Sequence, residues 1–169
     1  MNLTKNKYYF EALDHYPYSI PDCVEALNYA LSYDPQDADS LCLMARVYSE
    51  ILKDYNTAKV YFEEAMKNDV TSISIPHFYI KCLLYNEDYE EAEKLIAYSL
   101  TLKGINKADI LFLRSILKER KGKIKKALKI LSEVREYIFD EGMVHQLEDR
   151  KKFLKGKISR KRKRKPDRL

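Results

Sequence analysis

The sequence predicts an all-α protein built from repeated pairs of helices, and three observations lead to this prediction. Only four Gly and five Pro occur in 169 residues, so few residues interrupt long helices. A short string that ends in Ala recurs at a nearly constant interval, which is typical of helical repeats. Apolar residues follow each copy at the spacing of one helix face.

The recurring string defines four repeats. Its clearest copies are Asp54 to Ala58 and Asp88 to Ala92, which lie 34 residues apart. A further copy, Lys123 to Ala127, follows after 35 residues, and Asp22 to Ala26 precedes the first by 32. Each Ala is followed by apolar residues at offsets of mostly 3, 4, 7 and 8, so each string opens an amphipathic helix. A small residue lets two helices approach closely, and we therefore expect Ala58 and Ala92 to be buried at helix crossings.

A second apolar stripe precedes each string and predicts the first helix of each pair. The stripes are Leu41, Met44, Ala45, Tyr48 and Leu52 in the second repeat, Ile75, Phe78, Tyr79, Leu83 and Leu84 in the third, and Ile110, Leu111, Leu113, Ile116 and Leu117 in the fourth. The predicted repeats cover about 4–37, 38–71, 72–106 and 107–140. With a terminal helix they form a predicted domain over 1–149.

These repeats resemble the tetratricopeptide repeat (TPR) family over about residues 4–138. The second repeat carries the best match, at Leu41, Met44, Ala45, Tyr48, Ala58, Phe62 and Ala65. Val70 and Gly104 stand where the family closes a repeat with Pro, and Lys118 stands where it prefers an aromatic residue. The resemblance implies a short helical solenoid whose first helices line a concave groove, and a role in protein binding rather than catalysis.

The family's frame also implies which residues face the groove. They are Cys42, Arg46, Ser49, His77, Lys81, Tyr85, Phe112, Ile116 and Arg120. Arg46, Lys81 and Arg120 would form a ladder of cations along it. Some members of the family grip a peptide's C-terminal carboxylate with Lys, Asn and Arg, but this chain has no Asn at the corresponding places. A groove for an acidic or apolar peptide and a solvated face without a ligand are both compatible with the sequence.

No pattern in the sequence indicates an enzyme, a cofactor or a metal. The Gly residues are too few and too scattered for a phosphate-binding loop. The His and Cys residues stand apart from one another and lack the spacing of metal ligands: His15, His77, His145, Cys23, Cys42 and Cys82. We expect the three Cys to be reduced thiols in the core.

Charge is distributed very unevenly along the chain. The net charge is +5, but residues 150–169 contain twelve Lys and Arg and one acid, a net +11, whereas the first 149 carry −6. We expect 150–169 to be a largely disordered basic tail, with the last helix extending to about Lys157. Removing this tail after Asp149 is then expected to leave the fold intact. The predicted polyanion-binding residues are Arg160, Lys161, Arg162, Lys163, Arg164 and Lys165.

Two functions follow from these features. The leading hypothesis is an adaptor or scaffold that binds a protein or peptide in the groove. The alternative is an RNA- or ribosome-associated factor that binds polyanions through the tail. No apolar run is long enough for membrane insertion, and the sequence favours a cytoplasmic protein. In a eukaryotic cell the run Lys161 to Lys165 would also serve as a nuclear-import signal.

Overall fold

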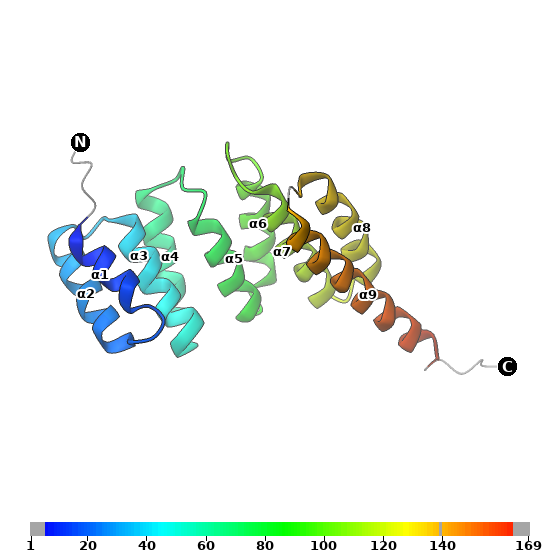
Figure 1. Ribbon diagram of the computed structural model, residues 1–169, viewed down its shortest axis with the longest axis horizontal. Coiled ribbons are helices and arrows are strands. Elements are labelled where there is room, and N and C mark those ends of the chain that lie inside the picture. The colour runs from blue at the N-terminus through cyan, green and yellow to red at the C-terminus, as the bar shows by residue number, and fades with distance from the viewer. Residues whose placement is uncertain (1–5, 139, 164–169) are drawn as a thin grey trace. The chain divides into compact units, whose positions relative to one another are not determined.

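The computed structural model describes residues 6–138 and 140–163, with side chains as far as Arg160 (Figure 1). Over these residues all regular structure is helical, which confirms the predicted all-α helical-repeat fold. The helices form four consecutive pairs, followed by a long terminal helix. They are α1 (Lys7–His15) and α2 (Ile20–Tyr33), α3 (Ala38–Arg46) and α4 (Tyr55–Asn68), α5 (Ile75–Tyr85) and α6 (Tyr89–Ser99), α7 (Lys107–Arg120) and α8 (Ile124–Val134), and α9 (Glu141–Lys163).

Polar caps and glycine turns set the helix boundaries. Asp37, Asp54 and Asn106 each accept a hydrogen bond from the backbone N–H three residues later, at 3.1, 3.1 and 3.3 Å. Such caps satisfy backbone donors that the first turn of a helix leaves unpaired. Gly104 and Gly122 adopt φ of 86° and 73° just before α7 and α8, a conformation that glycine adopts without steric cost.

The first helix of the second repeat has an irregular end. After α3 the chain continues as a π-helical segment, Val47–Leu52, and stops at Lys53, whose φ is 57°. π-helical segments are rare and often lie at functional sites. This one carries Ser49 and Glu50, which take part in the site described below.

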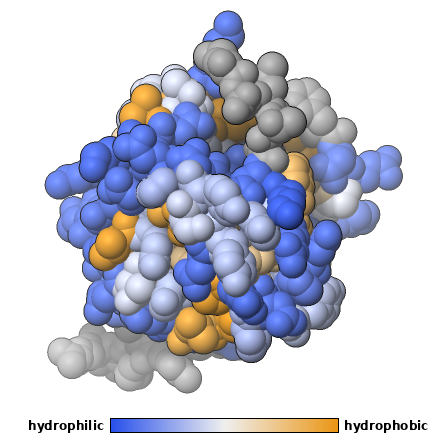
Figure 2. All heavy atoms as spheres, turned by 90° about the vertical axis from the view of Figure 1, so that its left-hand side faces the viewer, coloured by the Kyte–Doolittle hydropathy of each residue, from blue (hydrophilic) through white to orange (hydrophobic). Residues whose placement is uncertain are grey.

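The chain divides into two compact bodies, an N-terminal body (1–91) and a C-terminal body (92–169), with the boundary inside α6. In the N-terminal body, α1 to α3 bury a cluster that includes Ala12, Leu27 and Leu43. Seen from the side on which α1 lies, apolar side chains form small patches separated by hydrophilic ones (Figure 2). Ala58 and Ala92 are both 0 % exposed, so their predicted burial is confirmed.

The C-terminal body packs α7, α8 and α9 around one apolar cluster. Its buried members are Ala108, Leu111, Ile124, Ala127, Ile130, Leu131, Val134, Leu147 and Leu154. Leu147 and Leu154, which come from α9, are seven residues apart and therefore lie on the same face of the helix. The terminal helix is thus part of the core.

The structure corrects the prediction of a largely disordered tail from Arg150, because α9 extends to Lys163. Two kinds of contact explain why this charged segment folds. Leu154 is fully buried, and Arg150 and Lys157 both form ion pairs with the carboxylate of Glu119 in α7, the latter at 2.5 Å. No helix over residues 6–138 and 140–163 combines the length and apolar character that crossing a membrane requires.

Candidate binding site

Three of the predicted groove residues line one pocket in the N-terminal body. The pocket has a volume of about 220 Å³ and lies between the π-helical segment Val47–Leu52, which continues α3, and α5. Its lining residues are Ser49, Glu50, Lys53, Phe78, Lys81, Cys82 and Tyr85. Ser49, Lys81 and Tyr85 thus share one pocket, whereas a groove that runs along the first helices of the repeats stays a prediction.

Lys81 gives this pocket a positive charge beside aromatic rings. Within the described part of the chain, Lys81 makes no ion pair. Lys53, by contrast, donates a hydrogen bond from Nζ to the backbone oxygen of Glu50 at 2.6 Å. Tyr85 is 58 % exposed and stacks on Tyr55, with ring centroids 6.4 Å apart. The pocket thus combines a cation with aromatic surface that a ligand can reach.

Arg46 lies next to the pocket but is occupied by protein groups. Its guanidinium carbon is 4.0 Å from the ring centroid of Phe78 and 4.7 Å from that of Tyr16. Its Nε donates to Glu50 Oε1 at 3.3 Å, and the Tyr16 hydroxyl donates to the other oxygen of the same carboxylate. Burial, aided by this hydrogen bond to Glu50, raises the pKa of Tyr16 to about 12. Arg46 therefore holds the wall of the pocket in place, and Glu50 balances its charge.

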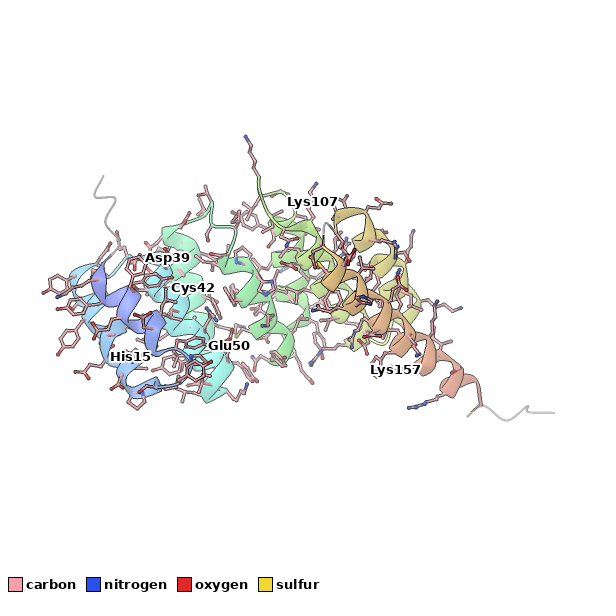
Figure 3. The ribbon with its side chains drawn as sticks, viewed as in Figure 1. His15, Asp39, Cys42, Glu50, Lys107 and Lys157 are labelled. Atoms are coloured by element: carbon pink, nitrogen blue, oxygen red, sulfur yellow. The ribbon has the colours of Figure 1, made fainter. Side chains whose placement is uncertain are left out.

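Two further predicted groove residues do not line the pocket. Cys42 is buried in α3, and burial raises the pKa of its thiol to about 12 (Figure 3). His77 is partly buried and meets the ring of Phe78 edge-on at 5.3 Å. Cys82 does line the pocket, but burial raises its pKa to about 11, so its thiol is a poor nucleophile at neutral pH.

The other predicted groove residues belong to the C-terminal body. Phe112 is partly buried and packs against the apolar cluster of that body. Ile116 is partly buried and Arg120 is exposed. A ladder of cations that includes Arg120 stays a prediction.

Four of the six predicted polyanion-binding residues lie at the end of α9. Arg160 is exposed on this helix, and Lys161, Arg162 and Lys163 are its last residues. Arg164 and Lys165 lie outside the described residues. Among the described residues, no group of three or more His, Cys, Asp or Glu side chains is arranged to hold a metal ion.

Sequence reasoning missed the contacts that fix these surfaces. Tyr16 and Phe78 hold Arg46 from positions that are 30 and 32 residues away in the chain. Glu119 holds Arg150 across a distance of 31 residues. Local periodicity carries no signal for such pairs. The spacing of Leu147 and Leu154 could have indicated that α9 packs on the body.

Comparison with known proteins supports the fold. No family model matches the sequence, and no curated protein matches it. Among solved structures, PilF of Pseudomonas aeruginosa, which contains TPRs, superposes with a TM-score of 0.72 at 16 % sequence identity. The match covers 79 % of this chain and 60 % of the PilF chain. At this identity the likeness concerns the fold alone, and the chain is therefore similar in architecture to a TPR protein.

Proposed function

We propose that this protein is a non-enzymatic adaptor that binds a segment of a protein partner in the pocket between the π-helical segment Val47–Leu52 and α5. The observation that carries the proposal is the position of Lys81, which makes no ion pair in the described structure and lies beside Phe78 and Tyr85. A carboxylate of the partner would pair with Lys81 through a charge-assisted hydrogen bond. An apolar neighbour in the same segment would pack against the two rings.

The size of the pocket favours a peptide side chain over a free small molecule. Small-molecule sites commonly enclose about 300–1,000 Å³, whereas this pocket has about 220 Å³. Such a volume accommodates one or two side chains while the rest of the segment lies on the surface. The similarity of the fold to PilF supports this class of function, because helical repeats bind partners along extended surfaces.

The charge of Glu50 is compatible with an acidic ligand. Its carboxylate lines the pocket and would repel a second carboxylate if it were unpaired. Arg46 donates to one of its oxygens and Tyr16 to the other, so the charge of Arg46 offsets that of the carboxylate. Among the described residues neither Lys53 nor Lys81 makes an ion pair, but Lys53 Nζ donates to the backbone oxygen of Glu50. We therefore expect Lys81 to decide whether an acidic segment binds.

A selection of random peptides displayed on phage tests this proposal. Peptides selected on the purified protein should carry an acidic residue next to an apolar one, and Lys81→Glu should weaken their binding at least about tenfold, or roughly 1.4 kcal/mol. The matched control is Lys67→Glu in α4, whose side chain is 74 % exposed and contacts the two carboxylate oxygens of Glu64 at 3.4 and 3.5 Å. The proposal is wrong if the peptides show no acidic preference, or if Lys81→Glu binds them as tightly as the control does.

A further inference from the structure

The terminal helix α9 divides its basic residues between two opposite faces. At 3.6 residues per turn, Leu147 and Leu154 define the buried face. Arg150 and Lys157 lie beside them and pair with Glu119. Lys152, Lys155 and Arg160 are exposed on the other side of the helix. The basic residues of α9 therefore have two roles. Some hold the helix in place through ion pairs, and others face solvent.

From this division we infer that the exposed face of α9 binds the phosphate backbone of a double-stranded nucleic acid. In the part of the chain that the structure describes, Lys152, Lys155 and Arg160 form no ion pairs. Their positions differ by 3 and 5 residues, so at 100° per residue they fall within an arc of roughly 140°. From Lys152 to Arg160 the helix rises about 12 Å, so the three cations are spread over about two turns of this face.

The fold holds this basic face ready before a ligand arrives. Glu119 is only 9 % exposed and holds two cations of α9, while Leu154 anchors the same stretch in the core. Cations near the C-terminus of a helix also interact favourably with its dipole. Figure 1 shows the C-terminal end of α9 extending beyond α7 and α8, so a duplex can approach this end of the helix. Because Glu119 and Leu154 already hold α9 in place, binding a ligand does not require the helix to become ordered, and this entropic cost is avoided.

The distribution of apolar residues favours a nucleic acid over a membrane surface. A helix that lies on a membrane needs an exposed apolar face, but Leu147 and Leu154 are used in the core. Phe153 is half exposed, and Arg150 and Lys157 lie against its ring, with cation-to-centroid distances of 5.3 and 4.6 Å. The exposed face thus offers charge rather than apolar surface, and charge alone suffices for phosphate contacts.

Fluorescence anisotropy with the full-length protein tests this inference. The probes are short fluorescein-labelled DNA and RNA duplexes of the same sequence, titrated at several salt concentrations between about 50 and 200 mM. The test variant reverses the three exposed cations together, as Lys152→Glu, Lys155→Glu and Arg160→Glu. If each cation meets one phosphate, the slope of log affinity against log salt should fall in magnitude by about 2.7 on the DNA duplex.

A second triple variant controls for the change in net charge. Lys125, Lys126 and Lys129 are exposed on α8 of the same body, and reversing all three alters the charge by the same amount. This control should keep the wild-type slope, and far-UV circular dichroism should show that both variants stay helical. Equal losses in the two variants would overturn the inference, because binding would then follow net charge and not the α9 face.

Two further outcomes would also overturn the inference. One is a wild-type protein that binds neither duplex at the lowest salt concentration. The other is displacement of the bound duplex by vesicles of phosphatidylserine and phosphatidylcholine at equal concentrations of anionic groups, which would make the same face a membrane-binding surface. The peptide site tested through Lys81 lies on the other body, so either proposal can fail while the other holds.

Discussion

Replacing Leu154 with Ala should destabilise the C-terminal body strongly, although the residue lies in a segment dominated by Lys and Arg. Leu154 is 0 % exposed and belongs to the cluster that α7, α8 and α9 share. The substitution removes three carbon atoms from this cluster. At about 0.8 kcal/mol for each buried carbon group, the loss of transfer free energy alone is about 2.4 kcal/mol. The cavity left behind raises the expected cost to about 2.7–5 kcal/mol.

The neighbouring residue provides a matched control for this prediction. Phe153 is 51 % exposed, and its described ring contacts are with Arg150 and Lys157. Phe153→Ala therefore removes surface contacts that are worth about 1 kcal/mol or less. The larger side chain should thus matter less than the smaller one, because burial decides the cost and not size.

Urea-induced unfolding followed by far-UV circular dichroism measures the difference. With a denaturant dependence of about 1–3 kcal/mol per molar, a loss of about 3 kcal/mol lowers the unfolding midpoint by about 1–3 M. Deleting all residues after Asp149 should have at least the effect of Leu154→Ala, contrary to the expectation from the sequence. If Leu154→Ala and Phe153→Ala shared the wild-type midpoint, α9 would contribute nothing to the fold, and the reasoning would fail.

The remaining predictions concern overpacking, alkaline pH and thiol reactivity. Ala58→Leu and Ala92→Leu should each cost about 1–3 kcal/mol, because both Ala are fully buried, and unchanged melting temperatures would contradict this. The pKa of Tyr16 is raised from 10.0 to about 12, so the folded state holds this proton more tightly than the unfolded state. The free energy of unfolding should therefore fall as the pH rises from 10 to about 12. Urea midpoints measured across this range should show the fall, and Tyr16→Phe should remove the share of it that is due to Tyr16. The thiols of Cys42 and Cys82, with pKa raised to about 12 and about 11, should react with Ellman's reagent only after unfolding; rapid labelling of the native protein would show that they are accessible.

Much of the fold could be predicted because its signals are local. A small residue at each helix crossing, followed by an apolar stripe, identifies a helix pair from about 30 residues of sequence, as in the repeat that contains Ala58. The π-helical segment Val47–Leu52 could not be predicted, since its hydrogen-bond pattern departs from the α-helix without a change in composition. The extension of α9 was missed because charge density argued for disorder, whereas Leu154 and Glu119 act through contacts with distant residues.

The candidate site was only partly predictable for the same reason. The repeat frame placed Ser49, Lys81 and Tyr85 on one surface, and they share a pocket. The repeat pattern also predicted that Arg46 is a cation available to a ligand. The sequence shows the charge of Arg46 but not the carboxylate that balances it. In the structure, Arg46 is held by Glu50 on its own helix and by Tyr16 from the first repeat.

The position of Arg46 has a consequence for how the N-terminal body responds to a ligand. In repeat proteins each repeat normally contacts only its neighbours, so perturbations spread one interface at a time. Arg46 touches Tyr16, which follows α1, and Phe78, which lies in α5, and so joins three successive repeats through one planar group. A ligand that shifts Phe78 must also change the contact between Arg46 and Tyr16. Occupancy of the pocket and docking of the first repeat are then energetically coupled, and by reciprocity a change at Tyr16 alters the affinity of the pocket.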